Sequence, residues 1–286
     1  MADKGAVLIT GASTGIGEAC ALHLDKLGYR VFAGIRKASD GECLHRRGSG
    51  RLVPVRLDIS DQAEIDNAAR SILGTLGGAG LDGLVNNAGV AVGGMLEFLP
   101  LDALRHQLEV NVIGQVAVTQ AFLPSLRKAQ GRIVNIGSLS GLISSPFSGA
   151  YSASKFALEA LTDSLRQELR PWKIHVSIVE PGHVQTPIVN KTLAAAEELL
   201  SQLPAEALQL YGPYLQAVRD ATQREAAQAV STEVVVKAVV HALTARRPRT
   251  RYAVGAYSGI GISLGRALPD RWRDALIARH LGLRKI

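Results

Sequence analysis

The chain of 286 residues is long enough for one large α/β unit with a full core, and no apolar run reaches the roughly 18 residues that a membrane span needs. The amino terminus has neither the apolar core nor the cleavage site of a signal peptide, and the only two cysteines, Cys20 and Cys43, give no disulfide framework and no zinc pattern, which favours the cytoplasm. The net charge of +7 comes from short basic clusters without interleaved aromatic residues, so solvated surfaces explain it first, an anionic cofactor or lipid next, and nucleic acid last.

A glycine-rich turn follows the first predicted element. Residues 6–10 (AVLIT) form a continuous apolar run, as expected for a parallel strand that is covered on both faces. GASTGIG comes next, with Gly11, Gly15 and Gly17 spaced G-x-x-x-G-x-G rather than G-x-G-x-x-G, and it opens a helix that ends at Gly28. The strand end and the helix N-terminus together present backbone N–H groups that suit a pyrophosphate, although a tight turn needs glycine in any case.

The second predicted strand, 30–35, ends where an adenosine ribose is usually recognised. An acidic residue at this place would accept hydrogen bonds from the ribose hydroxyls. Ile35 stands there instead, followed by Arg36 and Lys37. A guanidinium without an acid beside it suits a 2′-phosphate, so NADP(H) is favoured as the cofactor and NAD(H) stays open; a solvated Arg36 is the alternative interpretation.

The middle of the chain continues to alternate strands and helices. Strands are predicted at 51–57, 83–86, 132–137 and 174–179, and helices at 61–77, 101–128 and 150–169. Asp58 follows the third strand, where it would cap an adenine pocket, and the small residues of NNAG (86–89) let the chain pass close beneath a cofactor. Asn111 falls in the middle of a predicted helix, where asparagine has poor propensity, so it makes a local backbone bond or has a functional role.

The stretch 135–155 (NIGSLSGLISSPFSGAYSASK) holds the clearest chemical signal. It joins a strand end to a polar loop with Ser138 and then to a helix whose first turns carry Tyr151 and Lys155. Residues four apart share a helix face, so the lysine ammonium is expected to favour the phenolate and lower the Tyr151 pKa from its ordinary value of about 10. Such a group moves a proton to or from an alcohol oxygen, although Tyr-x-x-x-Lys alone also fits a half-buried Tyr beside a solvated Lys.

Further ligand-binding positions are expected after the strand at 174–179. The segment EPGHVQTP turns sharply at Pro181 and Gly182, and Thr186 offers a hydroxyl near the carboxyl end of the strand. Ligands of open α/β sheets bind at that edge. His183 fits a packing or pocket-lining position better than the position of a base.

The last third of the chain departs from the alternation. Residues 187–230 predict an amphipathic helical insert, which forms either a lid over the site or a peripheral helical hairpin. A helix at 232–246, capped by Thr232, and a last strand at 248–255 follow. The apolar tail 257–286 is a docking helix for another subunit, a wall of the substrate pocket or a membrane-surface helix. Since there is no internal repeat or linker, the whole chain is expected to form one domain.

The motifs TGASTGIG, NNAG, Asn111, Ser138, Tyr151-x-x-x-Lys155 and PG-x-x-x-T, in this order, resemble those of the short-chain dehydrogenase/reductase family. VSIVEPG, the insert after it and PRTRY resemble the branch that contains retinol and hydroxysteroid dehydrogenases. The resemblance implies an α/β fold, a Rossmann-like doubly wound parallel sheet of about seven strands with helices on both faces and a helical lid. It also implies hydride transfer between NAD(P)(H) and a lipophilic secondary alcohol or ketone, such as a steroid- or retinoid-like molecule.

The resemblance also assigns roles to individual residues. It implies that Tyr151 is the acid or base and that Ser138 bonds the substrate oxygen. It implies that Lys155 lowers the Tyr151 pKa and holds the nicotinamide ribose, and that Asn111 orders a water of the proton relay. The implied cofactor contacts are Gly11, Ser13, Thr14, Gly15, Ile16, Gly17, Arg36, Asp58, Ile59, Asn87, Ala88, Gly89, Tyr151, Lys155, Pro181, Gly182, Val184 and Thr186.

Two departures and two open questions accompany the resemblance. Several members of the branch use NAD, whereas Arg36 favours NADP, and some members have an amino-terminal membrane anchor that is not expected here. A homodimer or homotetramer through the helices at 101–128 and 150–170 fits the family, and peripheral membrane contact through the tail stays open. A cofactor-binding sensor or scaffold with little catalysis is the alternative function, but a sensor has no need of all four catalytic groups.

Overall fold

Seven parallel strands form one sheet at the centre of the molecule. The computed structural model of the chain describes residues 4–187, 197, 201, 203–255 and 268–283. Within these residues the strand order is β3-β2-β1-β4-β5-β6-β7. The strands are β1 (Ala6–Ile9), β2 (Arg30–Ile35), β3 (Leu52–Arg56), β4 (Gly83–Asn86), β5 (Arg132–Ile136), β6 (His175–Pro181) and β7 (Arg251–Val254). The predicted fold class is confirmed, and the predicted strands differ from these only at their ends.

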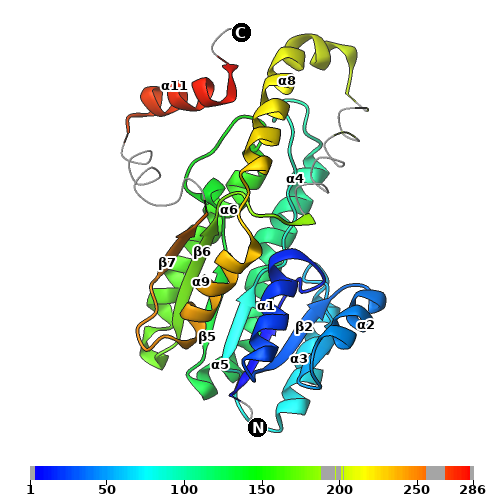
Figure 1. Ribbon diagram of the computed structural model, residues 1–286, viewed down its shortest axis with the longest axis vertical. Coiled ribbons are helices and arrows are strands. Elements are labelled where there is room, and N and C mark those ends of the chain that lie inside the picture. Colours follow the sequence, from blue (N-terminus) through cyan, green and yellow to red (C-terminus); the bar gives the residue numbers. More distant parts are fainter. Residues whose placement is uncertain (1–3, 188–196, 198–200, 202, 256–267, 284–286) are drawn as a thin grey trace.

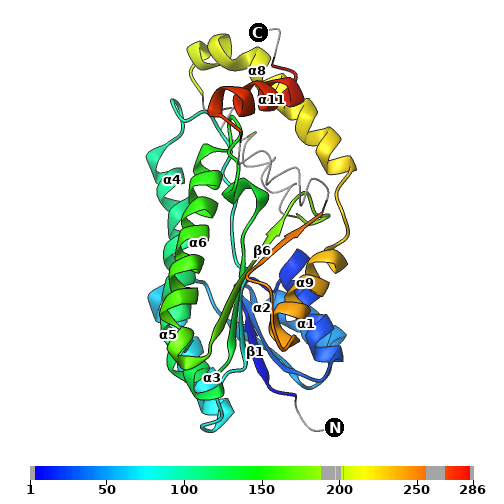
Figure 2. The ribbon, with the colours of Figure 1, turned by 90° about the vertical axis from the view of Figure 1, so that its left-hand side faces the viewer.

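Helices cover both faces of the sheet, as the edge-on view in Figure 2 shows. One face carries α1 (Gly15–Lys26), α2 (Ala38–Arg47) and α9 (Thr232–Thr244), and the other carries α3 (Gln62–Leu76), α4 (Leu101–Leu108), α5 (Gly114–Ala129) and α6 (Gly149–Glu168). Because side chains alternate along a strand, Val7 and Ile9 enter one hydrophobic core and Leu8 enters the other. Because the strands carry apolar side chains on both faces of the sheet, helices must cover both faces.

The strand order reverses between β1 and β4, and this reversal positions the site. The chain runs outward from β1 through β2 to β3, then returns to pair β4 with the other side of β1. At the carboxyl ends of these two strands the loops leave in opposite directions and open a crevice, which is where open α/β sheets bind ligands. The glycine-rich turn after β1 and the NNAG segment after β4 both lie at this reversal.

The predicted helix at 101–128 is not continuous. It divides into α4, a π-helical turn at Glu109–Ile113 and α5, with Asn111 inside the π turn. A π turn accommodates one extra residue and frees backbone groups, and such turns are frequent at functional sites. The predicted cap of α9 is also wrong by one residue, because Ser231 and not Thr232 accepts the hydrogen bond from the Glu233 amide (3.2 Å).

Two helices rise beyond the carboxyl edge of the sheet (Figure 1). They are α8 (Ala205–Ala227), which is the described part of the predicted insert, and α11 (Asp270–Leu281), which belongs to the predicted tail. His183 and His280 both bond Glu225 of α8, at 3.1 and 2.7 Å, so α8 is tied to the loop after β6 and to α11. Residues 188–196, 198–200 and 202 of the predicted insert and residues 257–267 and 284–286 of the predicted tail lie outside the described residues. Among the described helices, none combines the length and the apolar character that crossing a membrane requires.

Candidate active site

The glycine-rich turn is clamped by the NNAG segment. Thr10 Oγ1 accepts hydrogen bonds from the backbone amides of Asn87 and Ala88, each at 3.0 Å. The Asn87 side chain donates in return to the carbonyls of Thr10 and Gly11, also at 3.0 Å. These four bonds bring two segments that are more than 70 residues apart into one rigid layer.

Two glycines of this turn have no room for a side chain. Gly11 has a φ of +63°, and a Cβ there would lie 2.7 Å from the Ala88 Cα. A Cβ on Gly17 would lie 2.3 Å from the Gly11 carbonyl oxygen. A Cβ on Gly15 would meet Thr186 at 3.3 Å, which brings the loop after β6 against the same turn. The backbone is therefore exposed at the N-terminus of α1, where its N–H groups point outward from the helix, and this cradle fits a pyrophosphate.

The other positions predicted to contact the cofactor lie in this turn, in the segments after β3 and β4, and at or just after the end of β6. Thr14 is the N-cap of α1 without a side-chain cap bond, and Ser13 and Ile16 flank it in the same turn. Ile59 is buried against Gly114, and a Cβ on Gly89 would lie 3.3 Å from the Asn111 Oδ1. Pro181, Gly182 and Val184 belong to the segment that carries Thr186. A β-bridge pairs Val184 with Val230, which fixes that segment against the short connection between α8 and α9.

Arg36 and Asp58 lie together beyond the ends of β2 and β3. Arg36 is exposed, and Asp58 is half-buried and accepts a hydrogen bond from the Ser60 hydroxyl at 2.7 Å. Burial alone would raise the pKa of Asp58, but the bonds from Ser60 and the charges of Arg36 and His106 lower it. The two predicted adenosine contacts are thus close enough to interact, with the guanidinium on the outer, solvent-facing side.

Ser138, Tyr151 and Lys155 converge at the start of α6. Ser138 follows β5, and its hydroxyl lies near enough to the Tyr151 hydroxyl to influence its pKa. The Lys155 ammonium lies 5.7 Å from the centre of the Tyr151 ring and donates to the Ile136 carbonyl at 2.8 Å. The structure therefore brings together the three groups that the sequence places on the strand, the loop and the helix.

The pKa values of these groups are shifted by burial. Burial raises the pKa of Tyr151, and the nearby Ser138 hydroxyl opposes that shift. The net direction is opposite to the expected lowering by Lys155, because removal from water disfavours the phenolate. Burial lowers the pKa of Lys155 to about 8, with the charge of Glu159 acting in the other direction. The shifts move the pKa values of Tyr151 and Lys155 further apart than those of free tyrosine and lysine, which are 10.0 and 10.5.

Asn111 does not make the local backbone bond that was one of the two expectations, because its backbone partner, Val90, is 21 residues away in the sequence. Its side chain accepts from the Val90 amide and donates to the Val90 carbonyl, both at 2.9 Å, and it donates to the Ser154 hydroxyl at 3.1 Å. Gln107, one helical turn earlier and fully buried, bonds the Val92 amide at 2.7 Å and the Val90 carbonyl at 2.9 Å. These two amides hold the segment that leads into the cavity described next.

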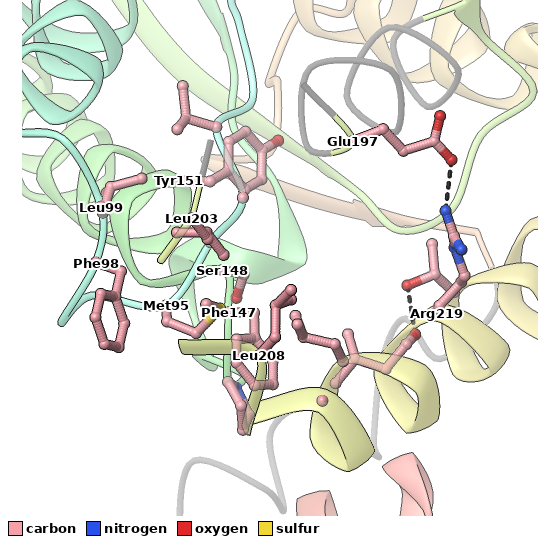
Figure 3. Close-up of a pocket in the computed structure, with 18 of the residues that line it drawn as sticks. Met95, Phe98, Leu99, Phe147, Ser148, Tyr151, Glu197, Leu203, Leu208 and Arg219 are labelled. Carbon is pink, nitrogen blue, oxygen red and sulfur yellow. Dashed lines mark hydrogen bonds and ion pairs between the residues drawn. The ribbon is translucent and has the colours of Figure 1, made fainter. Parts of the chain in front are cut away.

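A cavity of about 550 Å³ opens beside Tyr151 (Figure 3). Its walls are mainly apolar and come from the segment after β4, the loop before α6 and helix α8. Representative lining residues are Met95, Phe98, Leu99, Phe147, Leu203 and Leu208. Arg219 of α8 and Glu197 form an ion pair on the wall, and Figure 3 shows this pair on the opposite side of the drawn pocket from Tyr151. The site is therefore an apolar chamber with Tyr151 at one end and a charged pair at another.

Comparison with known proteins decides the family. The model of the short chain dehydrogenase family matches residues 5–198. The chain belongs to the short-chain dehydrogenase family.

The curated relatives of this short-chain dehydrogenase are named after several different substrates. It is 39% identical to retinol dehydrogenase 5 of Mus musculus over 95% of this chain and 87% of the relative. It is 40% identical to the mitochondrial D-beta-hydroxybutyrate dehydrogenase of Bos taurus, over 86% and 76%. It is 38% identical to 17-beta-hydroxysteroid dehydrogenase type 6 of Bos taurus, over 87% and 80%. The resemblance to the retinol and hydroxysteroid branch is confirmed, and the chain is an NAD(P)-dependent oxidoreductase.

Solved structures give the same fold. A short-chain dehydrogenase from Streptomyces avermitilis matches 100% of this chain and 99% of its own, with a TM-score of 0.78 and 28% identity. A short-chain dehydrogenase from Burkholderia cenocepacia J2315 in complex with NADP matches 98% of each chain, with a TM-score of 0.72 and 28% identity. The glycine cradle of this short-chain dehydrogenase, which a Cβ at Gly11 or Gly17 would fill, fits the dinucleotide that the family binds.

Sequence reasoning missed several residues that shape this site. Gln107 was overlooked, although its spacing of four from Asn111 puts two amides on one buried helix face, and that spacing was a usable signal. Glu159, Glu180 and Arg251 were also missed. They come from α6, β6 and β7 and meet only in the folded chain. His183, expected to pack or line the pocket, pairs with Glu225 at 3.1 Å instead of lining this cavity.

Proposed function

We propose that this short-chain dehydrogenase is an NADP(H)-dependent enzyme that acts on a lipophilic secondary alcohol or ketone of steroid- or retinoid-like size. The observation that carries the proposal is the apolar cavity of about 550 Å³ that opens on Tyr151. Ligand pockets of about 300–1,000 Å³ with apolar walls and few polar groups suit molecules of that size. The named substrates of the retinol and hydroxysteroid relatives are consistent with it.

The cofactor is proposed to lie along the carboxyl edge of β1 and β4. The N–H groups at the start of α1 and the Thr186 hydroxyl would hold the pyrophosphate, and Asp58 would border the adenine. Arg36 would bind the 2′-phosphate that distinguishes NADP from NAD, because a guanidinium bonds phosphate through two parallel N–H donors. When bound, the nicotinamide supplies or accepts the hydride.

Tyr151 is proposed to move the proton at the substrate oxygen. Its hydroxyl is the polar group at the reactive end of the cavity, and Ser138 is placed to bond the same oxygen and orient it. Lys155, whose ammonium lies 5.7 Å from the centre of the Tyr151 ring, would favour the phenolate electrostatically and would hold the ribose hydroxyls of the nicotinamide half. Asn111 fixes the Val90 backbone beside this group and is proposed to support the proton relay from there.

The cofactor is tested first, by titration with NADPH and NADH while nicotinamide fluorescence is followed. Wild type should prefer NADPH, and Arg36→Ala should lose that preference by weakening NADPH more than NADH. Lys37→Ala is the matched control, because Lys37 is an adjacent exposed cation at the same strand end. Better binding of NADH by wild type would refute the role of Arg36, and binding of neither cofactor would refute the proposed function.

Catalysis is tested with ketones of increasing apolar size and a Tyr151→Phe variant. The variant should retain NADPH binding and lose turnover, on the order of 10²–10⁴-fold for loss of a general acid. Unchanged turnover would refute the mechanism. Turnover by wild type separates the enzyme from the alternative of a cofactor-binding sensor, because a sensor that binds cofactor would show none.

Contact with a lipid surface through α11 is a second part of the proposal. Trp272 and Leu276 lie one helical turn apart and are 69% and 55% exposed. Arg271 and Arg279, also exposed, would lie near anionic headgroups. Trp272→Glu with Leu276→Glu should reduce co-sedimentation with anionic vesicles, whereas Leu101→Glu, which changes an exposed leucine far along the chain, should not. Equal pelleting of all three proteins would refute this contact.

Self-association through α5 and α6 is proposed on similar grounds. Ile113 and Phe156 are exposed large apolar side chains on this layer. Their replacement by aspartate should convert an oligomer into a monomer in light scattering, and a monomeric wild type would refute the proposal.

A further inference from the structure

Three carboxylates meet one guanidinium behind the proton-transfer group. Arg251 of β7 bonds Glu159 of α6, Glu180 of β6 at 2.9 Å and Asp163 of α6 at 2.8 Å. Glu159 and Glu180 are 7% and 2% exposed, whereas Asp163 lies nearer the surface. A half-buried arginine shared by two buried carboxylates is costly to assemble, because each carboxylate gives up its hydration. Because burial of these charges costs free energy, the cluster is expected to have a role other than stabilising the fold.

Glu159 connects the cluster to the active site. It follows Lys155 by one helical turn, so the two side chains share a face of α6. A Cβ on Gly137, which precedes Ser138, would lie 3.3 Å from Glu159 Oε1, and a Cβ on Gly141 would lie 3.2 Å from the Glu159 Cγ. The carboxyl group thus lies against the loop that carries Ser138, in space left by two residues without side chains.

The two oxygens of Glu159 are in different situations. Oε2 accepts from Arg251, while Oε1 is buried without a hydrogen-bond partner among the described residues. Burial and the neighbouring Glu180 raise the pKa of Glu159 to about 7, and Arg251 acts in the other direction. Two carboxyl groups that share one arginine hold a proton more readily than either does alone.

We propose that Glu159 is a positioning residue that keeps Lys155 in its charged form, with Arg251 and Glu180 fixing the carboxyl group one helical turn behind it. Lys155 is buried and donates to the Ile136 carbonyl. That carbonyl is neutral, so this hydrogen bond does not balance the charge of the ammonium. Glu159 is the charged group that acts on it. The inference rests on the proposed role of Lys155 in holding the ribose and favouring the phenolate.

The charged groups around Glu159 come from three elements. Helix α6 contributes Lys155, Asp163 and Arg166, and Arg166 pairs with Asp163 at 2.9 Å. Strand β6 contributes Glu180, and β7 contributes Arg251. The 3-10 turn at Leu139–Gly141 that also packs on α6 carries no titratable side chain. The remaining elements against α6 carry Asp102, Arg105, His106, Glu109 and Arg170.

The sign of the effect follows from Coulomb attraction. A carboxylate near an ammonium raises the ammonium pKa, so removing that carboxylate lowers it. With Glu159→Gln, Lys155 should lose its proton at a lower pH than in wild type. At pH 6 the two proteins should behave alike, since Lys155 is charged in both. The difference should grow above pH 7, where Glu159 is ionised in wild type.

The test is the dissociation constant of NADPH as a function of pH from 6 to 9.5, measured by nicotinamide fluorescence. The alkaline loss of affinity should begin about one pH unit lower in Glu159→Gln than in wild type, which is about a tenfold weaker Kd at pH 8.5. Glu159→Asp, which keeps the charge, should restore most of the wild-type midpoint. Asp163→Asn is the matched control, because it removes an Arg251 partner that lies away from Lys155.

The outcomes separate this inference from the proposed function. If wild type binds neither NADPH nor NADH, the proposed function fails. If wild type binds NADPH and Glu159→Gln has the same alkaline midpoint, the inference fails. A shift of equal size in Asp163→Asn would also overturn it, because the effect would then belong to Arg251 alone.

A second measurement leaves Glu159 unchanged and covers the case in which Glu159→Gln does not fold. The ¹³Cε resonance of Lys155 in the cofactor-free wild type, assigned by its loss in Lys155→Arg, should titrate in two steps. The smaller step should come at the lower pH, where Glu159 ionises, and the main step at the higher pH, where Lys155 does. A single inflection would overturn the inference.

Discussion

Gly17 offers a direct test of the cradle at the start of α1. A Cβ at this position would lie 2.3 Å from the Gly11 carbonyl oxygen and 2.5 Å from the Asn87 Nδ2. Nonbonded heavy atoms rest about 3.5 Å apart, so Gly17→Ala must push the turn or the Asn87 amide away by about 1 Å. The atoms displaced are those of the Asn87–Gly11 hydrogen bond, which clamps the turn to NNAG.

The structure sets the size of the effect. Forcing a methyl group into a filled site costs about 1–3 kcal/mol, and breaking the partly buried Asn87–Gly11 bond adds about 1 kcal/mol. The free energy of unfolding should therefore fall by about 2–4 kcal/mol. A turn displaced by about 1 Å no longer aims its N–H groups at a phosphate, so NADPH affinity should fall by at least tenfold, or about 1.4 kcal/mol.

Urea unfolding followed by circular dichroism gives the first quantity, and fluorescence titration with NADPH gives the second. Gly74→Ala is the matched control, because Gly74 lies inside α3 with nothing within 4 Å of its Cβ position. That change should leave NADPH binding unaltered and stabilise the protein by about 0.5–1 kcal/mol. Wild-type NADPH affinity in Gly17→Ala, or a loss of stability below about 0.5 kcal/mol, would refute the close packing of the cradle.

Three further predictions concern the core, the cysteines and the cavity. Phe122→Ala, which removes a fully buried ring between α5 and the sheet, should cost about 3–5 kcal/mol in urea unfolding, and a change below 1 kcal/mol would contradict the core described above. Iodoacetamide should modify exposed Cys43 within minutes under native conditions and leave Cys20 unmodified, because burial raises the pKa of the Cys20 thiol to about 12. Mass spectrometry of peptides measures the labelling, and equal labelling of the two cysteines would contradict the prediction. Arg219→Leu should raise KM about tenfold for a ketone that carries a carboxylate or hydroxyl at its far end and leave kcat unchanged, since hydrogen bonds to charged groups are worth about 1.5–3 kcal/mol. An equal rise in KM for a wholly apolar ketone would contradict binding of that polar group by Arg219.

The fold was predictable because its signals are local. The runs at β2 and β4 are short, apolar and bounded by turns, and their limits agree with the predicted ones. Tyr151 and Lys155 were predictable for the same reason, since four residues on a helix fix one face whatever surrounds it. Asn111 was flagged by its poor helix propensity, but the π turn that contains it was not foreseen, because the extra residue there is accommodated by contacts with Val90 and Ser154.

What the sequence did not reveal depends on partners that are distant along the chain. The expected direction of the Tyr151 pKa was wrong because it counted the neighbouring charge of Lys155 and could not count burial, which is set by the cavity walls and by α8. The cap of α9 was misplaced by one residue because Ser231 and Thr232 offer the same chemistry, and only the backbone angle decides between them.

The Glu159 cluster shows why such residues escape pattern reading and why they still matter. Glu159, Glu180 and Arg251 look like ordinary charges on a helix and at two strand ends, and no spacing relates them. Parallel pairing of β6 with β7 sets Arg251 beside β6, and packing of α6 on β6 brings Glu159 to it. Burying each charge costs several kcal/mol, which the pairing of the carboxylates with Arg251 offsets. Glu159 Oε1 lies against the Ser138 loop without a hydrogen-bond partner among the described residues. The charge state of Lys155 is therefore tied to the last strand of the sheet, so that substitutions at β7, far along the sequence, should alter the pH dependence of cofactor binding.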